Sequence, residues 1–368
     1  MRSSYTETRL IGDRGYSFCS LPTLVRQDTD EQPTLEVSGP NREGEIMRVL
    51  TSAQLRRFNE EGYLVVENVL DPNHDIAPVL AEYEEVLDDI VRSLVGKGAV
   101  SSTRRDLPFA ERLIQICIES GRNFPQEFDI SLPQTGVHHD TPIHVGPAVF
   151  GLLTNPRLLD LVEDLIGPEI YSNPVQHIRM KLPKRAVSQT DYSGLVSQIP
   201  WHQDTGVILP EADQSTILTV WFPLNEATVG NGCLQVIPRS HLGDLIAHCP
   251  TQKGVAIPEP LISTQQAVPL PMRPGSVLLM TSRTVHSSLD NVTEHEVRLS
   301  FDLRYQPIGQ PTGRPAFPGF IARSAAHPES ALRDPAAWAQ LWYDARTRLA
   351  EQENPAFNRW RAGVGMCA

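Results

Sequence analysis

The spacing of hydrophobic residues changes along the chain near residue 167. Before that point apolar side chains recur every three or four positions, which is typical of amphipathic helices, and the clearest such segment covers 76–95. Further helices are predicted from Thr51 to the turn at Gly62, over 109–120 and over 155–166. The last of these has Asn155 at its start and Gly167 at its end, as a capped helix would.

After residue 167 the apolar runs are short, β-branched or alternating, and Pro, Gly or Asn bounds them. Strands are therefore predicted at 169–182, 215–224, 232–238, 275–281 and 297–306, followed by a Trp-rich helical tail at 336–361. A short apolar run predicts one earlier strand at 63–66. This order predicts a mainly β fold with flanking helices, in which N-terminal helices buttress a double-stranded β-helix (jelly-roll) core.

The same pattern suggests three parts of the chain. We predict a polar N-terminal arm over 1–45, a single domain over 46–310 that holds the helices and the jelly-roll core, and a C-terminal helical extension over 311–368. The 31 prolines fit this picture, because they divide the chain into short pieces joined by turns.

Composition narrows the function classes. The 44 acidic residues outnumber the 32 basic ones, and a net charge of −12 argues against nucleic acid or an anionic membrane surface as a partner. No apolar run is long enough to span a bilayer, and the first residues lack the apolar stretch of a secretory signal. The five cysteines form no CxxC pair, which predicts free thiols and a cytoplasmic location.

Three residues carry the strongest chemical signal. In an extended strand His202 and Asp204 project to the same side, because side chains alternate, and His286 follows the run at 276–280 as a third candidate ligand. Two histidines and one carboxylate on one face of a metal ion are typical of non-haem Fe(II) oxygenases. An ordinary buried and hydrogen-bonded histidine is the alternative for His202.

A second group of possible ligands occurs at 137–140, where His138, His139 and Asp140 are adjacent and His144 follows. This group lies before the helix at 155–166 and outside the strand-rich half. We therefore expect a loop that faces the substrate or has a purely structural role, not the metal site.

The strand at 297–306 alternates, with Arg298, Ser300, Asp302 and Arg304 on one face. A solvated outer face would explain this pattern, because antiparallel sheets often have one wet side. Next to a metal ligand, however, a guanidinium is suited to hold a carboxylate through two hydrogen bonds. We predict that Arg298 binds the carboxylate of a co-substrate and that Ser300 adds a hydroxyl group to the same site.

From about residue 51 to about 307 the sequence resembles the phytanoyl-CoA dioxygenase family of Fe(II)/2-oxoglutarate oxygenases. The resemblance is carried by four stretches in order, at 60–70, 201–204, 231–241 and 274–298. It implies a double-stranded β-helix, iron bound by His202, Asp204 and His286, and 2-oxoglutarate held by Arg298.

The family also places a polar contact to 2-oxoglutarate on an early core strand, where Gln176 and Lys181 are the candidates. His241 lies in the family's Ser-His turn, near the pocket or in a structural role. The candidates for substrate binding are His138, His144, Trp201 and His241.

The resemblance implies an enzyme that uses Fe(II), 2-oxoglutarate and O2 to oxidise, most often to hydroxylate, a C–H bond of a small organic molecule, with release of succinate and CO2. Secondary metabolism is one setting for such a reaction. Asp204 argues against halogenation, because halogenases of this type lack the carboxylate. Two alternatives stay open: a cupin-like metalloenzyme that does not use 2-oxoglutarate, and a non-catalytic binding protein on the same fold.

Overall fold

Apart from one short strand at 63–66 and one helix near the C-terminus, helices precede strands along the chain, as the hydrophobic pattern predicts. The computed structural model describes residues 48–368 except 189–194, 252–253, 354, 361–366 and 368, so the predicted arm at 1–45 lies outside the described residues. The described part forms one compact unit by itself. It has a mainly β core with flanking helices, consistent with a jelly roll.

The helices are α1 (Ser52–Glu61), α2 (Ala77–Gly96, preceded by a π-helical turn at Pro72–Ile76), α3 (Phe109–Ser120), α4 (Pro125–Phe128), α5 (Pro147–Leu153), α6 (Pro156–Ile166) and α7 (Pro335–Glu351). The strands are β1 (Tyr63–Val66), β2 (Ile170–Lys181), β3 (Leu218–Pro223), β4 (Leu234–Val236), β5 (Cys249–Thr251), β6 (Gly254–Ala256), β7 (Val268–Leu270), β8 (Val277–Thr281), β9 (His286–Ser288), β10 (Arg298–Pro307) and β11 (Phe320–Arg323).

Local sequence signals explain where the first helices begin and end. The Thr51 hydroxyl accepts from the backbone of Gln54, whose side chain bonds back to Thr51, and Gly62 ends α1 in a left-handed conformation with φ 82°. Asn155 caps α6 with Pro156 at its first position. The predicted helices at 76–95, 109–120 and 155–166 are confirmed to within a residue at each end.

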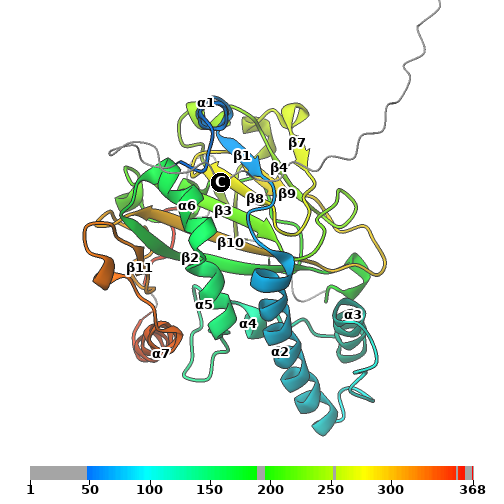
Figure 1. Cartoon of the computed structure of the whole chain (residues 1–368). Helices are drawn as coiled ribbons and strands as arrows, with labels where there is room; N and C mark the ends of the chain where they lie inside the picture. Colours follow the sequence, from blue (N-terminus) through cyan, green and yellow to red (C-terminus); the bar gives the residue numbers. More distant parts are fainter. Residues whose placement is uncertain (1–47, 189–194, 252–253, 354, 361–366, 368) are drawn as a thin grey trace, which may run out of the picture. The chain divides into compact units, whose positions relative to one another are not determined.

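Two antiparallel sheets form the core (Figure 1). The larger has six strands in the order β1-β8-β3-β10-β2-β11, and the smaller has three in the order β7-β4-β9. Strands far apart in sequence are neighbours: β10 lies between β3 and β2, and Arg298 pairs with Lys181 while Arg304 pairs with Thr219. The topology therefore brings residues from distant segments onto one inner face.

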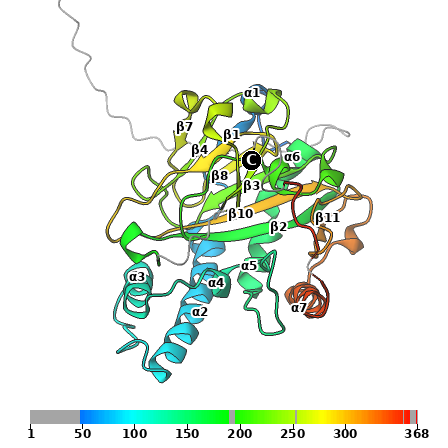
Figure 2. The same ribbon diagram turned by 180° about the vertical axis from the view of Figure 1, so that it is seen from behind.

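The alternation of β10 separates the two faces of the large sheet. Its apolar residues Leu299, Phe301, Leu303 and Tyr305 belong to the main hydrophobic cluster, which also contains residues of α2 to α6. The Phe301 ring lies 6.4 Å from that of Tyr83 in α2, and the Tyr305 hydroxyl donates to the Leu153 carbonyl in α5. Figure 2 shows the same sheet from behind, with β2 and β10 in front of these helices. The polar residues of β10 face the other way, toward the smaller sheet.

The C-terminal segment differs from its prediction. The helix predicted over 336–361 ends at Glu351 in α7, a few residues before Pro355, which cannot extend a helix. Trp338 and Trp342 of α7 are buried in the main cluster, and β11 adds an unpredicted edge strand to the large sheet.

The prediction of free thiols is wrong for one pair of cysteines. Cys249 and Cys367 form a disulfide between Cα atoms 5.2 Å apart, while Cys117 and Cys233 are buried and Cys19 lies outside the described residues. The two bonded cysteines are 118 residues apart, so no sequence spacing could indicate the pairing. Among the helices that the structure describes, none is sufficiently long and apolar to cross a membrane.

The packing of β10 on the helices predicts a large effect of core truncation. Phe301→Ala should lower the free energy of unfolding by about 3–5 kcal/mol, because it leaves a cavity among fully buried rings. Denaturant unfolding measures this, with Val292→Ala at a 66 % exposed position as the matched control that should change stability by less than about 0.5 kcal/mol. Equal losses for the two variants would contradict the assignment of this face to the core.

Candidate metal centre

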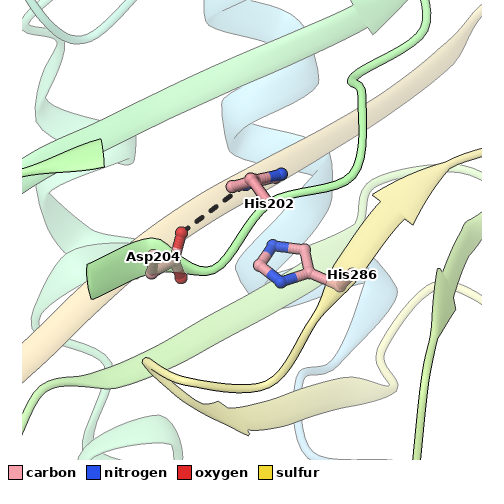
Figure 3. A group of neighbouring side chains, drawn as sticks. All are labelled: His202, Asp204 and His286. Atoms are coloured by element: carbon pink, nitrogen blue, oxygen red, sulfur yellow. Dashed lines mark ion pairs between the residues drawn. The ribbon is translucent and has the colours of Figure 1, made fainter. Parts of the chain in front are cut away.

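A short antiparallel bridge brings His202 and His286 together. The backbone N–H of each donates to the carbonyl of the other over 3.0 Å, although the two residues are far apart in sequence. Their ring centroids lie 4.2 Å apart, and both side chains are buried. Figure 3 shows the two imidazoles and the Asp204 carboxylate gathered around one point between the strands.

Backbone carbonyls set the orientation of the two imidazoles. Nδ1 of His202 lies 2.9 Å from the carbonyl of Pro200, and Nδ1 of His286 lies 2.9 Å from that of Thr284. A neutral imidazole that donates from Nδ1 leaves Nε2 free to bind a metal. Burial and the neighbouring His286 lower the pKa of His202 to about 3, so this ring is neutral at physiological pH.

Asp204 reaches the same point from the start of a 3-10 turn. The sequence predicts that His202 and Asp204 lie in extended backbone, but only His202 makes a bridge, and a 3-10 turn begins at Asp204. The predicted alternation holds nevertheless: Gln203 is extended, and its side chain bonds away from the site to the Arg283 carbonyl. The His202 Nε2 atom lies 3.7 Å from Asp204 Oδ1.

Two buried groups hold the Asp204 carboxylate. The Thr219 hydroxyl in β3 donates to Oδ2, and Nη2 of Arg304 in β10 donates to Oδ1 over 2.6 Å. Burial by itself raises the pKa of Asp204, but the Arg304 charge outweighs this effect and the pKa falls to about 2. The carboxylate is therefore ionised at neutral pH and fixed in orientation.

Arg304 belongs to a buried row of alternating charges. Its guanidinium also lies 3.1 Å from Asp302, whose other oxygen accepts from Nη2 of Arg179 in β2 over 2.8 Å. Burial disfavours all of these charges, but Asp204 and then Asp302 raise the pKa of Arg304 above its usual value. Each arginine in this row is paired with an aspartate, so neither Arg304 nor Arg179 is available to pair with a separate anion.

The donor set fits a divalent metal ion. The three candidate ligand atoms, one each from His202, Asp204 and His286, all lie within 4.8 Å of one another, and all three residues are buried. Within the described part of the chain this is the only such group of three or more His, Cys, Asp or Glu residues. The adjacent histidines at 138–139 are exposed in a turn and form no such group, as expected from the sequence.

Arg298 lies on the same inner face of β10, fully buried. Its Nε donates to the Gly232 carbonyl over 3.2 Å and its Nη1 donates to the Ser300 hydroxyl, while Nη2 has no partner among the described residues. The guanidinium lies 5.5 Å from the ring of Trp221. Burial, and then the charge of Arg179, lower the pKa of Arg298 to about 9, because no carboxylate of the described residues pairs with it.

The two candidates on the early strand point in opposite directions. Lys181 lies on the inner face beside Arg298, and its amine donates to the Leu289 carbonyl over 2.5 Å and to the Ser288 hydroxyl. Gln176 faces the helices, where its amide donates to the Ile130 carbonyl over 3.0 Å. Only Lys181 is therefore placed on the face that carries the metal centre.

A cavity of about 560 Å³ opens beside His202. Its described lining comes from β2, β5, β6 and β10, from the segments around 134 and 195–207, and from residues after β10. The lining residues are Gln134, Thr135, Val175, His177, Arg179, Leu195, Ile199, Pro200, His202, Val207, Pro250, Thr251, Gly254, Val255, Arg304, Arg314 and Asn358. Cavities of this size are typical of small-molecule sites.

Of the four residues predicted to bind substrate, none is among the described residues that line this cavity. His138 is exposed in a turn, and His144 pairs with Glu82 at 3.2 Å on the helical side. Trp201 packs in a small cluster with Ile257 and others, next to the metal centre but outside the cavity. Nε2 of His241 donates to the Asn59 carbonyl of α1 over 3.0 Å, which is a structural contact. Their role in substrate binding stays a prediction without support from this placement.

Several residues that shape the site were not predicted from the sequence. Thr219 is one polar residue in the apolar run of β3, and Arg179 alternates with apolar residues in β2. The strand pattern could therefore have indicated both residues as polar positions on an inner face. Arg314 follows β10 in an irregular segment, where no periodicity could place it.

Two histidines and one carboxylate on a mainly β core define a non-haem iron oxygenase site. The family model for phytanoyl-CoA dioxygenase (PhyH) matches residues 58–300, a stretch that contains all three candidate ligands. The chain therefore belongs to the phytanoyl-CoA dioxygenase family, and it is a non-haem iron, 2-oxoglutarate-dependent oxygenase.

Individual relatives agree with this family. The chain is 25 % identical over 261 residues to phytanoyl-CoA dioxygenase domain-containing protein 1 of Danio rerio, covering 67 % of this chain and 87 % of that protein. It is 26 % identical over 261 residues to a probable phytanoyl-CoA dioxygenase of Caenorhabditis elegans, covering 69 % and 73 %. Among solved structures it resembles the apo form of the non-haem monooxygenase ThoJ, with a TM-score of 0.52, 20 % identity and coverage of 80 % and 94 %. This last likeness supports the fold.

The hydroxyl group that holds Asp204 predicts an effect on metal affinity. Thr219→Val removes this hydrogen bond with little change in shape, and we expect about tenfold weaker binding of Mn²⁺, a redox-stable probe, in calorimetric titration. Thr347→Val on the exposed face of α7 is the matched control. An unchanged dissociation constant for Thr219→Val would show that the carboxylate needs no such support.

Proposed function

We propose that this protein oxidises a C–H bond of a small organic molecule, by hydroxylation, with Fe(II) as cofactor and 2-oxoglutarate and O2 as co-substrates. The observation that carries the proposal is the buried guanidinium of Arg298, without an acidic partner among the described residues, on the face of β10 whose Arg304 bonds to Asp204 of the metal centre. The double-stranded β-helix of the family is the proposed arrangement of the two sheets.

The residues of the metal centre suit Fe(II). Two imidazoles and one ionised carboxylate leave part of the coordination sphere for other ligands. Iron with 2-oxoglutarate and O2 supplies the oxidising power when bound, and the reaction yields succinate and CO2. The protein holds the ion through His202, Asp204 and His286, and Thr219 and Arg304 keep the carboxylate in position.

Arg298 and Ser300 are proposed to bind the distal carboxylate of 2-oxoglutarate. A dianion of this kind supplies the negative charge that the buried guanidinium lacks, and the Ser300 hydroxyl already lies against Nη1. Lys181, on the same inner face, is the proposed additional polar contact. Gln176 is not proposed for this role, because it bonds to the helical layer.

The cavity beside His202 is proposed to hold the substrate. It positions one C–H bond next to the metal and limits the access of water, which is the protein's part in such chemistry. Its volume of about 560 Å³ suits a small molecule, and the chain's net charge of −12 does not favour a polyphosphate such as an acyl-CoA. The setting in secondary metabolism and the cytoplasmic location stay predictions.

If Arg298 binds the co-substrate, replacing it should weaken the binding of 2-oxoglutarate. Arg298→Met should raise the dissociation constant for 2-oxoglutarate about 10- to 100-fold in the anaerobic Fe(II) protein, because charge-assisted hydrogen bonds to the carboxylate are lost. Arg298→Lys, which keeps a positive charge, should recover part of the affinity. A variant that remains active with an unchanged requirement for 2-oxoglutarate would show that Arg298 does not bind the co-substrate, whereas wild-type activity without 2-oxoglutarate would favour the cupin-like alternative.

The second alternative, a non-catalytic binding protein, makes a different prediction. Wild-type protein with anaerobic Fe(II) and 2-oxoglutarate should develop a visible charge-transfer band and should release succinate slowly in air even without substrate. Iron that binds without producing this band would contradict the proposed function. His139→Ala, which changes an exposed histidine outside the metal centre, should leave the band unchanged.

A further inference from the structure

Arg314 lines the cavity beside His202 and has no anionic partner in the described part of the chain. It is 2 % exposed, and the one hydrogen bond of its guanidinium to the described residues runs from Nη2 to the Val207 carbonyl over 2.8 Å. Its Nε is buried without a partner. The segment between β10 and β11 therefore delivers an uncompensated positive charge to the wall of the cavity.

Other buried arginines of the described residues show how unusual this is. Arg112 pairs with Asp88 at 2.7 Å, and Arg304 pairs with Asp204 at 2.6 Å. Arg298 and Arg314 are the two buried arginines for which the described residues provide no ion pair. A buried charge without a partner is costly, so a protein keeps one where a ligand supplies the opposite charge. The proposed function assigns an anion to Arg298 and leaves Arg314 without one.

The surroundings of Arg314 hold the guanidinium in place. Its carbon atom lies 5.9 Å from the ring of Phe317 and 5.4 Å from that of Phe357, and the backbone N–H of Arg314 donates to the Thr312 hydroxyl. These contacts fix the side chain before any ligand binds. Burial, and then Arg304, lower the pKa of Arg314 to about 10, so the group is still charged at neutral pH.

The remaining charges of the cavity compensate one another. No aspartate or glutamate is among the described lining residues, and the other two arginines, Arg179 and Arg304, are paired with Asp302 and Asp204 behind the wall. One positive charge is thus left for a ligand in the cavity. A single guanidinium matches a carboxylate in charge and in shape, whereas a phosphate dianion would keep a residual charge.

We propose that the substrate is an organic acid whose carboxylate binds Arg314, so that Arg314 determines both the class of substrate and its orientation relative to the metal centre. The inference rests on the proposed function, because it takes the cavity beside His202 as the substrate site. It assigns the two unpaired guanidiniums to two different anions, with 2-oxoglutarate at Arg298 and the substrate at Arg314.

Stability without ligand gives the first test. If Arg314 serves a ligand, Arg314→Met removes an uncompensated charge and should not lower the midpoint of thermal unfolding of the free protein. The matched control is Arg346→Met, since Arg346 also donates to a carbonyl, that of Thr141, and lies 5.1 Å from the ring of Tyr343, but does so away from the cavity. A midpoint that falls more in Arg314→Met than in Arg346→Met would assign Arg314 a structural role and overturn the proposal.

Binding of small acids gives the second test. Protein loaded with Mn²⁺ and saturating 2-oxoglutarate is titrated with propionate, hexanoate, phenylacetate and cinnamate, each beside its primary amide, and with phenyl phosphate. At least one acid should raise the unfolding midpoint of wild type and Arg346→Met, whereas its amide should not, and Arg314→Met should lose the shift. The proposal is overturned if no acid exceeds its amide, if the shift survives in Arg314→Met, or if phenyl phosphate exceeds every carboxylate.

The same titrations separate this inference from the proposed function. The midpoint shift caused by 2-oxoglutarate should be lost in Arg298→Met and retained in Arg314→Met. Loss of the 2-oxoglutarate shift in Arg314→Met would mean that this residue serves the co-substrate, and would overturn the inference while leaving the oxygenase assignment intact. Absence of any 2-oxoglutarate shift in wild type would contradict the proposed function, whatever the acids do.

Discussion

The metal centre depends on one backbone interaction, the reciprocal pair of hydrogen bonds between His202 and His286. This bridge joins the segment before β3 to the start of β9 and sets the two imidazoles 4.2 Å apart between their ring centroids. Carbonyls two residues earlier fix both rings, so the geometry of the ligands follows from backbone pairing. Asp204 joins them because the chain turns immediately after the bridge.

The electrostatics of the interior follow from this arrangement. Acidic and basic side chains alternate from Asp204 through Arg304 and Asp302 to Arg179, and each charge in this row has a neighbour of opposite sign. Arg298 and Arg314 stand outside the row. Burial penalises any unpaired charge, so these two arginines mark the positions where we propose that anionic ligands bind. Arg298 lies on the inner face of β10, and Arg314 lines the cavity beside His202.

Much of this could be predicted from sequence, because strand periodicity records which face each residue occupies. The alternation from Arg298 to Arg304 predicted an inner polar face, and the spacing of His202 and Asp204 predicted their convergence. Periodicity fails where the backbone is irregular: it gave no indication of Arg314, of the end of α7 or of the pairing of Cys249 with Cys367. It also cannot tell a histidine that faces a cavity from one that packs on a helix, as His144 and His241 show.

The most direct test of the account is anomalous diffraction at the iron edge from anaerobic crystals of the Fe(II)-loaded protein. The account predicts one strong iron peak per chain, between the Nε2 atoms of His202 and His286 and the Asp204 carboxylate, and no comparable peak elsewhere. An iron peak at another position, such as the exposed histidines at 138–139, or no peak between these three side chains in protein that contains iron, would contradict it.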